Sequence, residues 1–210
     1  MNILLKNIKR LFIDDSKDVD SIHAYWRNPD EDNNPLKYIS VNDRSEYLLD
    51  SLKKLHIYPY SSILEIGCNV GRNLNHLYNN GYNNISGVEI SKNALDLLNI
   101  EFPKLNAALF NSSIEDYFKE HEYTKYDLIF TMAVLEHIHK DSEWIFEEMV
   151  NNCNRYILTI EDEKSISWRH FPRNYNKIFS KLGMKQIHKE KCKKNSGLNN
   201  KFVLRIFCKI

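Results

Sequence analysis

The sequence predicts an α/β protein built on a mostly parallel sheet, and three observations lead to that fold class. Short apolar runs alternate with segments of helical spacing from Ser61 onward, which is typical of repeated βα units. With 210 residues and 42% hydrophobic content, the chain is long enough to bury one full core. No internal repeat or linker divides it. We therefore expect one domain over residues 61–210, with residues 1–60 as an N-terminal extension of the same domain.

The composition excludes several classes of function. The formal net charge is +1, so the chain lacks the overall positive field of a dedicated nucleic-acid-binding protein. No apolar run approaches the length of a membrane span, and the first ten residues are too weakly apolar for a secretory signal. The cysteines form no C-x-x-C pair, so neither a disulfide framework nor a zinc site is expected; they are Cys68, Cys153, Cys192 and Cys208. We expect a soluble, cytoplasmic protein.

The N-terminal extension is polar and rich in turns, and it is expected to be irregular at first. Tyr25, Trp26 and Tyr38 are aromatic residues in this loop-like setting. Two interpretations stay open for them: they pack the extension onto the main domain, or they line a substrate pocket. Residues 45–55 then carry apolar side chains with helical spacing, which predicts an amphipathic helix.

The first βα unit has the clearest local pattern. Ile63, Leu64 and Ile66 form a short apolar run that stops at Gly67, which predicts a buried strand ending in a tight turn. Helical spacing resumes after Gly71. Backbone N–H groups and the positive start of the helix then face a crevice beyond the carboxyl end of the strand, which suits a nucleotide-like ligand.

The later elements continue the alternation. Ser91 and Ser113 are expected to cap helices, the second in a Ser-x-x-Asp pattern that resembles a capping box. The Lys/Asn/Gly-rich segment 191–200 is expected to be a mobile surface loop between the last two strands. Further strands are predicted over residues 85–90, 107–110, 126–131, 155–160, 184–188 and 202–207, and further helices over residues 142–150 and 175–182.

Glu89 ends the second predicted strand, about 20 residues after the glycine turn. A carboxylate at this place can accept hydrogen bonds from both hydroxyls of a ribose. The G-x-G-x-x-G pattern of pyrophosphate sites is absent, because Asn69 occupies the position of its middle glycine. NAD is therefore disfavoured, whereas a nucleoside is expected. Asn is among the few residues that enter positive φ readily, so Asn69 is expected to have a positive φ.

Four separated motifs resemble those of the class I S-adenosylmethionine-dependent methyltransferases and occur in the order found in that family. They are Glu65-x-Gly67-x-Asn69-x-Gly71, Glu89, Ser113-Ile-Glu-Asp116, and Tyr126-Asp-Leu-Ile-Phe-Thr-Met-Ala-Val-Leu-Glu-His-Ile138. The resemblance covers roughly residues 60–160. It implies a Rossmann-like sheet of seven strands with helices on both faces and the last strand antiparallel. It also implies that S-adenosylmethionine lies across the strand ends and that S-adenosylhomocysteine is the product.

The resemblance further implies roles for individual residues. Glu65 would orient the turn or the methionine ammonium, Glu89 would hold the ribose, and Ser113 with Ile114 would flank the adenine. Asn69 stands where the family usually has a second glycine, and Ser113 where it often has Asp. The full set implied for the cofactor is Glu65, Gly67, Cys68, Asn69, Gly71, Arg72, Asn73, Glu89, Ile90, Ser113, Ile114, Thr131, Met132 and Ala133.

The acceptor side needs a group that provides for the proton of a neutral nucleophile, because methyl transfer is an in-line displacement at a sulfonium. His137 follows the fourth predicted strand and is the candidate general base, since a histidine there is expected to titrate near neutrality. The alternative is that His137 only packs or hydrogen-bonds near the cofactor. His139 would not share a helical face with His137, so no metal site is expected.

A charged segment after the fifth predicted strand, beginning with Glu161-Asp-Glu163, is expected to build the acceptor pocket. In addition to His137, the candidate substrate-binding residues are four in this segment, which could hold an anionic acceptor: Arg169, His170, Arg173 and Tyr175. Arg44 and Arg72 would extend the positive wall. A merely solvated loop is the alternative interpretation.

The expected function is therefore methyl transfer from S-adenosylmethionine to a small-molecule acceptor, at oxygen rather than nitrogen. The acceptor is expected to be anionic, or linked to a nucleotide or a sugar. A nucleic-acid substrate is disfavoured and no membrane association is expected. The alternatives are a non-catalytic S-adenosylmethionine-binding partner protein and a tRNA or rRNA methyltransferase. The oligomeric state stays open.

Overall fold

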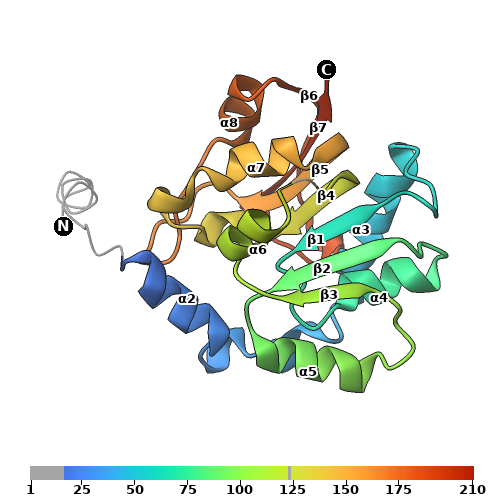
Figure 1. Cartoon of the computed structure of the whole chain (residues 1–210), viewed down its shortest axis with the longest axis vertical. Helices are drawn as coiled ribbons and strands as arrows, with labels where there is room; N and C mark the ends of the chain where they lie inside the picture. Colours follow the sequence, from blue (N-terminus) through green and yellow to red (C-terminus); the bar gives the residue numbers. More distant parts are fainter. Residues whose placement is uncertain (1–16, 123) are drawn as a thin grey trace.

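A computed structural model describes residues 17–122 and 124–210 of the chain. Seven strands form one sheet in the order β3-β2-β1-β4-β5-β7-β6 (Figure 1). Strands β1 to β5 pair in parallel, whereas β7 runs antiparallel to both β5 and β6. The predicted fold class is thus confirmed, with the last strand antiparallel. The strands are β1 (Ile63–Ile66), β2 (Ile85–Glu89), β3 (Ala108–Asn111), β4 (Tyr126–Met132), β5 (Cys153–Asp162), β6 (Met184–Lys191) and β7 (Phe202–Lys209).

Helices cover both faces of the sheet, so the core lies in two layers. Leu128 and Ile129 are neighbours in β4 and are both fully buried, but they belong to opposite layers, as strand pleating requires. This burial on both faces explains why the strands are apolar runs without alternation. The first layer lies under α3 (Asn42–Lys54), α4 (Arg72–Asn79) and α5 (Lys92–Glu101), and the second under α6 (Ile114–Glu120), α7 (Ile145–Asn151) and α8 (Tyr175–Lys181).

The N-terminal extension begins with a helix, α2 (Val19–Arg27), so the expectation of loop-like surroundings for Tyr25 and Trp26 is wrong. The Asp18 side chain accepts a hydrogen bond from Ser21 N at 2.8 Å and caps this helix. Two 3₁₀ turns follow, η1 (Glu31–Asn33) and η2 (Pro35–Tyr38). Residues 1–16, which the sequence predicts to be part of the extension, lie outside the described residues.

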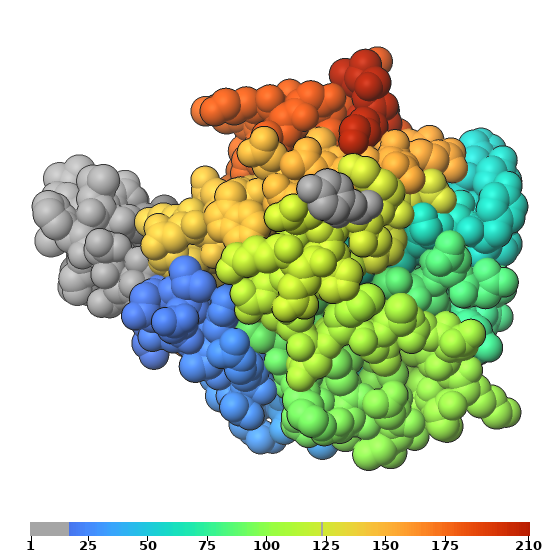
Figure 2. Space-filling model, in the orientation of Figure 1, coloured from blue at the N-terminus to red at the C-terminus, as the bar shows by residue number. Residues whose placement is uncertain are grey.

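Helix α2 lies on the side of the sheet where the carboxyl ends of β2 and β3 are found (Figure 1). In the space-filling view this N-terminal part of the chain packs against the segments that follow β2 and β3 (Figure 2). His23 Nε2 lies 3.1 Å from Glu115 Oε2, and Ser91 Oγ donates to Arg27 O at 3.1 Å. The extension is thereby attached to the strand ends, where a ligand site is expected.

Three other boundaries differ from the expected ones. Strand β5 continues through Glu161 and Asp162, so these acidic residues belong to the sheet and not to a loop. Helix α7 starts at Ile145, after the 3₁₀ turn η4 (Lys140–Ser142). The segment between β6 and β7 contains η5 (Lys194–Ser196) and packs against α3, where Arg44 Nε donates to Gly197 O at 3.0 Å. It is therefore not a free surface loop.

Over residues 17–122 and 124–210, no helix has the length and apolar character needed to cross a membrane.

Candidate functional site

A cavity of about 400 Å³ lies at the carboxyl ends of β1, β2 and β4. The turn after β1 and the end of β2 form one part of its wall, and the residues that follow β4 form another. Helix α2 contributes Val19, Ile22, His23 and Trp26 to the same wall. The volume is within the range of pockets that hold cofactors and small ligands. The cavity thus lies where the sequence predicts a ligand site.

The turn after β1 has a left-handed backbone at two residues that line the cavity, Gly67 and Asn69. Gly67 has φ +71°, and a Cβ added there would lie 2.4 Å from Val134 Cγ2. Asn69 has φ +49°, which confirms the expected positive value. Gly71 also has a positive φ, but it packs against Leu98 and does not line the cavity. Gly71 therefore shapes the start of α4 and is not a contact residue, contrary to the cofactor role implied for it.

Glu89 stands at the end of β2 and links the turn to the next helix. Its Oε2 accepts from Asn69 N at 2.9 Å, and its Oε1 accepts from Ser91 N at 2.8 Å. Burial raises the pKa of this carboxyl group. A carboxylate has about four lone-pair positions, so two acceptor positions remain for hydroxyl groups in the cavity. Ile90 also lines this part of the wall.

Ser113 and Ile114 line the cavity beyond Glu89. The Ser113 hydroxyl is committed to the predicted helix cap, because it accepts from Asp116 N at 3.1 Å and donates to Asp116 Oδ2 at 2.8 Å. The residue therefore has no free hydroxyl hydrogen for a ligand. Ile114 gives this end of the cavity an apolar wall.

Glu65 lies at the opposite end of the cavity, next to Asn73 and Arg72. Its Oε1 accepts from Asn73 Nδ2 at 2.7 Å, while its buried Oε2 has no hydrogen-bond partner among the described residues. The Arg72 guanidinium is buried and donates to Ser45 Oγ at 3.0 Å and to Asn73 Oδ1 at 3.0 Å. An unpaired buried acceptor beside a buried cation suits a ligand that carries both an ammonium and a carboxylate. Cys68 lines the wall between this end and Glu89.

The residues at the end of β4 divide between the cavity and the core. Met132 and Ala133 line the cavity, and Ala133 has φ +59°, a costly value for a non-glycine residue. Thr131 is fully buried and donates from its hydroxyl to Glu161 Oε1 at 2.7 Å. The Thr131 hydroxyl is thus directed to Glu161, and Thr131 is not among the residues that line the cavity.

His137, in the 3₁₀ turn η3 (Leu135–His137), lines the cavity next to Trp26, with the two ring centroids 4.5 Å apart. Its Nδ1 lies 2.7 Å from Arg169 O, so this nitrogen carries the proton and Nε2 presents a lone pair. Burial lowers the pKa of His137 to about 3. The expectation that His137 titrates near neutrality is therefore wrong: the ring is a neutral hydrogen-bond acceptor at physiological pH.

The four other predicted substrate residues separate into two pairs. Arg169 and His170 line the cavity. The Arg169 guanidinium lies over the rings of Tyr25 and Trp26, 5.0 and 5.6 Å from their centroids. It has no carboxylate partner among the described residues.

Arg173 and Tyr175, also predicted to bind the substrate, are not among the residues that line the cavity. The guanidinium of Arg173 donates to Leu135 O, Phe171 O and Ile138 O at 2.8 to 3.2 Å. Its Nε also donates to Glu143 Oε1 at 3.0 Å. Arg173 therefore fastens the segment after β5 to η3. Tyr175 is fully buried in the second core layer.

Several lining residues were missed by the sequence analysis, notably His23 and Glu136. The spacing of Val19, Ile22, His23 and Trp26 is a helical signal that could have identified α2. Glu136 has no comparable signal, because only the fold brings it beside the segment after β5, where Phe171 N donates to Glu136 O at 2.8 Å.

The state of Glu65 predicts how ligand binding depends on pH. Burial raises the pKa of Glu65 to about 8, although the Asn73 hydrogen bond and the charge of Arg72 oppose this shift and the charge of Glu89 adds to it. Below pH 8 the free protein holds a proton that must leave when an ammonium binds. The affinity for an amino-acid ligand should therefore increase between about pH 6 and pH 8, by up to about tenfold per unit.

Calorimetry with S-adenosylhomocysteine in buffers of different ionisation enthalpy measures this proton release. Glu65→Gln should remove the release, because glutamine does not titrate. A wild-type affinity and proton count that stay constant from pH 6 to pH 8 would contradict the assignment.

Comparison with known proteins shows which protein family the chain resembles. A family model described as a methyltransferase domain matches residues 6–177. No curated protein matches the sequence.

Several solved structures have a similar fold. Magnesium protoporphyrin IX methyltransferase from Synechocystis PCC 6803, solved with S-adenosylhomocysteine bound, aligns with a TM-score of 0.70 and 12% identity over 94% of this chain and 100% of that chain. An S-adenosylmethionine-dependent methyltransferase from Mesorhizobium loti aligns with a TM-score of 0.63 and 11% identity over 81% and 100% of the two chains. One from Archaeoglobus fulgidus aligns with a TM-score of 0.60 and 15% identity over 79% and 94%. At these identities the likeness concerns the fold.

Proposed function

The chain belongs to the methyltransferase domain family, and we propose that it methylates a hydroxyl oxygen of a small anionic molecule. It is an S-adenosylmethionine-dependent methyltransferase of the class I fold. The acceptor and the atom that receives the methyl group are the parts that we propose.

The observation that carries the proposal is that one cavity joins an unpaired carboxyl oxygen of Glu65, a Glu89 carboxylate with spare acceptor positions, and the side chains of His137 and Arg169. The unpaired Glu65 Oε2 fits the methionine ammonium, and the Arg72 guanidinium lies beside it for the carboxylate. The Glu89 carboxylate, with two free acceptor positions, fits the ribose hydroxyls. Bound S-adenosylmethionine supplies an electrophilic methyl group on a positively charged sulfur.

Enclosure and charge support a small anionic acceptor. Helix α2 and the segment after β5 wall the cavity with Trp26, His137 and Arg169. The Arg169 guanidinium faces this space without a described ion pair, so an acidic group on the acceptor would find a charged partner there. A nucleic-acid duplex needs an open basic groove, and α2 occupies that side of the site.

The choice of oxygen follows from the polar groups beside Met132 and Ala133. An unprotonated amine attacks a methyl group without prior deprotonation, whereas a hydroxyl needs a partner for its proton. Glu136 Oε1 and His137 Nε2 lie 3.6 Å apart, and both residues line the cavity. The Nε2 lone pair of the neutral His137 ring is an acceptor that a hydroxyl nucleophile requires and an unprotonated amine does not. Trp26 adds a buried Nε1 with no hydrogen-bond partner in the described part of the chain.

Replacing His137 with asparagine is expected to lower turnover at least tenfold while leaving the affinity for S-adenosylhomocysteine within about twofold. The reason is that Nε2 faces the acceptor end, whereas the cofactor contacts lie on β1 and β2. The assay follows S-adenosylhomocysteine formation over a panel of small hydroxylated anions, with aminated analogues beside them.

Turnover of the His137→Asn variant equal to that of wild type would remove His137 from the mechanism. Product from the amines alone would overturn the assignment of oxygen, and intact binding without any product would favour a non-catalytic binding protein.

A further inference from the structure

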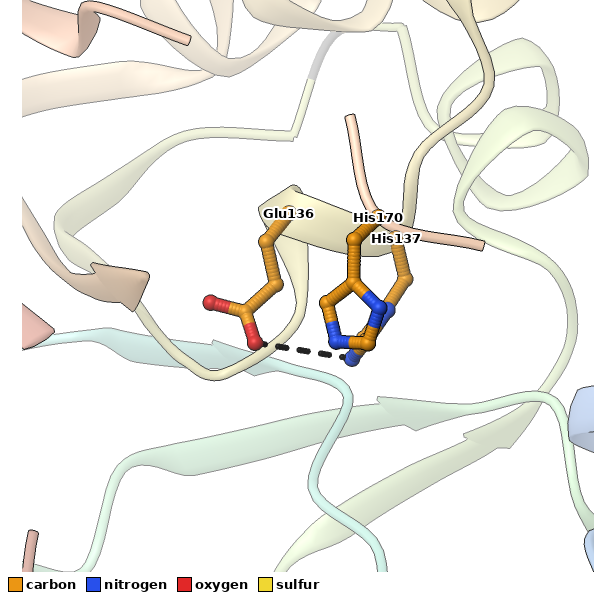
Figure 3. Close-up of side chains that lie close together, drawn as sticks. All are labelled: Glu136, His137 and His170. Atoms are coloured by element: carbon orange, nitrogen blue, oxygen red, sulfur yellow. Dashed lines mark ion pairs between the residues drawn. The ribbon is translucent and has the colours of Figure 1, made fainter. Parts of the chain in front are cut away.

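Three potential metal ligands converge at the acceptor end of the cavity. They are the carboxylate of Glu136 and the imidazoles of His137 and His170, which Figure 3 shows turned toward one another. One donor atom from each lies within 4.8 Å of the other two. Glu136 comes from η3 beside His137, whereas His170 comes from the segment after β5, 33 positions further along the chain than His137.

Each of the three side chains is held by a partner on the side away from its free donor atom. His137 Nδ1 bonds to Arg169 O at 2.7 Å, and His170 Nδ1 lies 2.6 Å from Ser167 Oγ. Glu136 Oε2 accepts from the backbone N–H of Asp162. Among residues 17–122 and 124–210, the atoms left without a hydrogen bond are Glu136 Oε1, His137 Nε2 and His170 Nε2. This is the arrangement of metal-binding histidines, whose second ring nitrogen is oriented by an outer hydrogen bond.

The spacing of the free atoms suits a single ion. Glu136 Oε1 and His137 Nε2 are 3.6 Å apart, and two ligands bound at about 2.1 Å in a tetrahedral site lie about 3.4 Å apart. The donor atom of His170 lies within 4.8 Å of the other two, and its ring belongs to a partly buried turn where Ser167 Oγ holds Nδ1 at 2.6 Å. The turn itself is fixed to η3, because Phe171 N donates to Glu136 O at 2.8 Å.

Carboxyl groups without a cationic partner surround the three donor atoms. Glu136, Glu161 and Asp162 are buried close together at the end of β5. Thr131 and the backbone of Val134 and Glu136 satisfy Glu161 with hydrogen bonds. No Lys or Arg lies within ion-pair distance of these three carboxylates in the described part of the chain. Burial and the neighbouring Glu161 raise the pKa of Glu136 to about 9, so a cation bound at its free oxygen would replace a proton there.

We propose that Glu136, His137 and His170 bind a first-row divalent transition-metal cation, such as Zn²⁺, Mn²⁺ or Fe²⁺, which coordinates the acceptor hydroxyl. Two imidazoles and one carboxylate select this class over Mg²⁺ and Ca²⁺, which prefer oxygen ligands. Three protein ligands leave open positions, as in catalytic metal sites. All three residues line the cavity, so an open position faces the acceptor. The sequence expectation of no metal considered only His137 with His139 and could not include His170.

The substrate half of this inference rests on the proposed function. A hydroxyl bound to the ion loses its proton to solvent water more readily, because the ion stabilises the oxyanion. The oxygen lone pair then forms the bond to the methyl carbon as the carbon–sulfur bond breaks, and that electron pair stays on sulfur. The products are a methyl ether, S-adenosylhomocysteine with an uncharged sulfur, and one proton in water. This assignment explains how a site whose histidine is neutral can activate a hydroxyl.

The test is a titration of the chelator-treated, dialysed full-length protein with Co²⁺, followed by its visible absorption and by calorimetry. We expect saturation at one equivalent per chain and displacement of Co²⁺ by Zn²⁺. His137→Asn and His170→Asn should each weaken Co²⁺ binding more than about 100-fold, and Ser167→Ala about tenfold, because it only orients His170. His139→Asn, two residues from His137, is the matched control and should bind Co²⁺ as tightly as wild type.

Binding of S-adenosylhomocysteine is measured on the same samples and shows that each variant is folded. It also separates the two proposals. A wild type that binds S-adenosylhomocysteine but takes up no Co²⁺ or Zn²⁺, or histidine variants that bind Co²⁺ like wild type, would overturn the metal site and leave the proposed function standing. A wild type that binds the metal but not S-adenosylhomocysteine would overturn the proposed function instead.

Discussion

Replacing Glu89 with alanine is expected to weaken the binding of S-adenosylhomocysteine by at least about 100-fold. The ribose would lose two hydrogen bonds to a buried carboxylate, each worth about 1.5 to 3 kcal/mol when one partner is charged. The turn would also lose the acceptor for Asn69 N and Ser91 N, which hold the cavity wall in place. Calorimetric titration of both proteins measures the difference.

Two further variants make this result specific. Glu89→Gln keeps the shape and one acceptor oxygen, so its affinity should lie between those of wild type and Glu89→Ala. Glu101→Ala removes an exposed carboxylate at the end of α5, outside the cavity, and should bind like wild type. An affinity of Glu89→Ala within threefold of wild type would show that the ribose lies elsewhere.

Replacing Arg173 with methionine is expected to destabilise the protein by about 3 kcal/mol. The change leaves three buried carbonyl groups, those of Leu135, Ile138 and Phe171, without the donors that the guanidinium supplies. Unsatisfied buried polar groups cost about 1 to 3 kcal/mol each, and relaxation recovers part of that cost. Urea unfolding followed by circular dichroism gives the free energy of unfolding.

Arg169→Met is the matched control for that experiment. The Arg169 guanidinium lies over aromatic rings and faces the cavity, so its loss should change the free energy of unfolding by less than about 1 kcal/mol. It should instead raise the Michaelis constant for an anionic acceptor about tenfold or more. An Arg173→Met protein that is as stable as wild type but has a raised Michaelis constant for the acceptor would contradict the structural role of Arg173 and indicate that it binds the acceptor.

The cofactor half of the site could be predicted from the sequence because it is encoded locally. A strand, a turn and a helix follow one another within residues 63–79, and their backbone geometry follows from Gly67 and Asn69. Glu89 ends the neighbouring strand, so parallel pairing of β1 with β2 brings it to the turn. The sequence did not show that Gly71 and Thr131 lie outside the cavity wall, because a position in a motif does not tell which way a residue faces.

The acceptor half could not be predicted in the same way, because it depends on contacts between distant segments. His170 reaches Glu136 only through a loop whose shape is fixed by Arg173 and by the Phe171 backbone. The pKa of His137 is low because that loop and Trp26 bury the ring. Helix α2 was missed for a different reason: polar residues and the Asn28-Pro29 turn masked a short apolar face.

The most direct test of the central claim, that this cavity is an S-adenosylmethionine site, is calorimetric titration of the wild-type protein with S-adenosylhomocysteine at pH 8. The structure predicts saturable binding at one equivalent per chain, with Glu65 deprotonated in about half of the free molecules at that pH. A folded wild-type protein that shows no binding at millimolar ligand would contradict the claim.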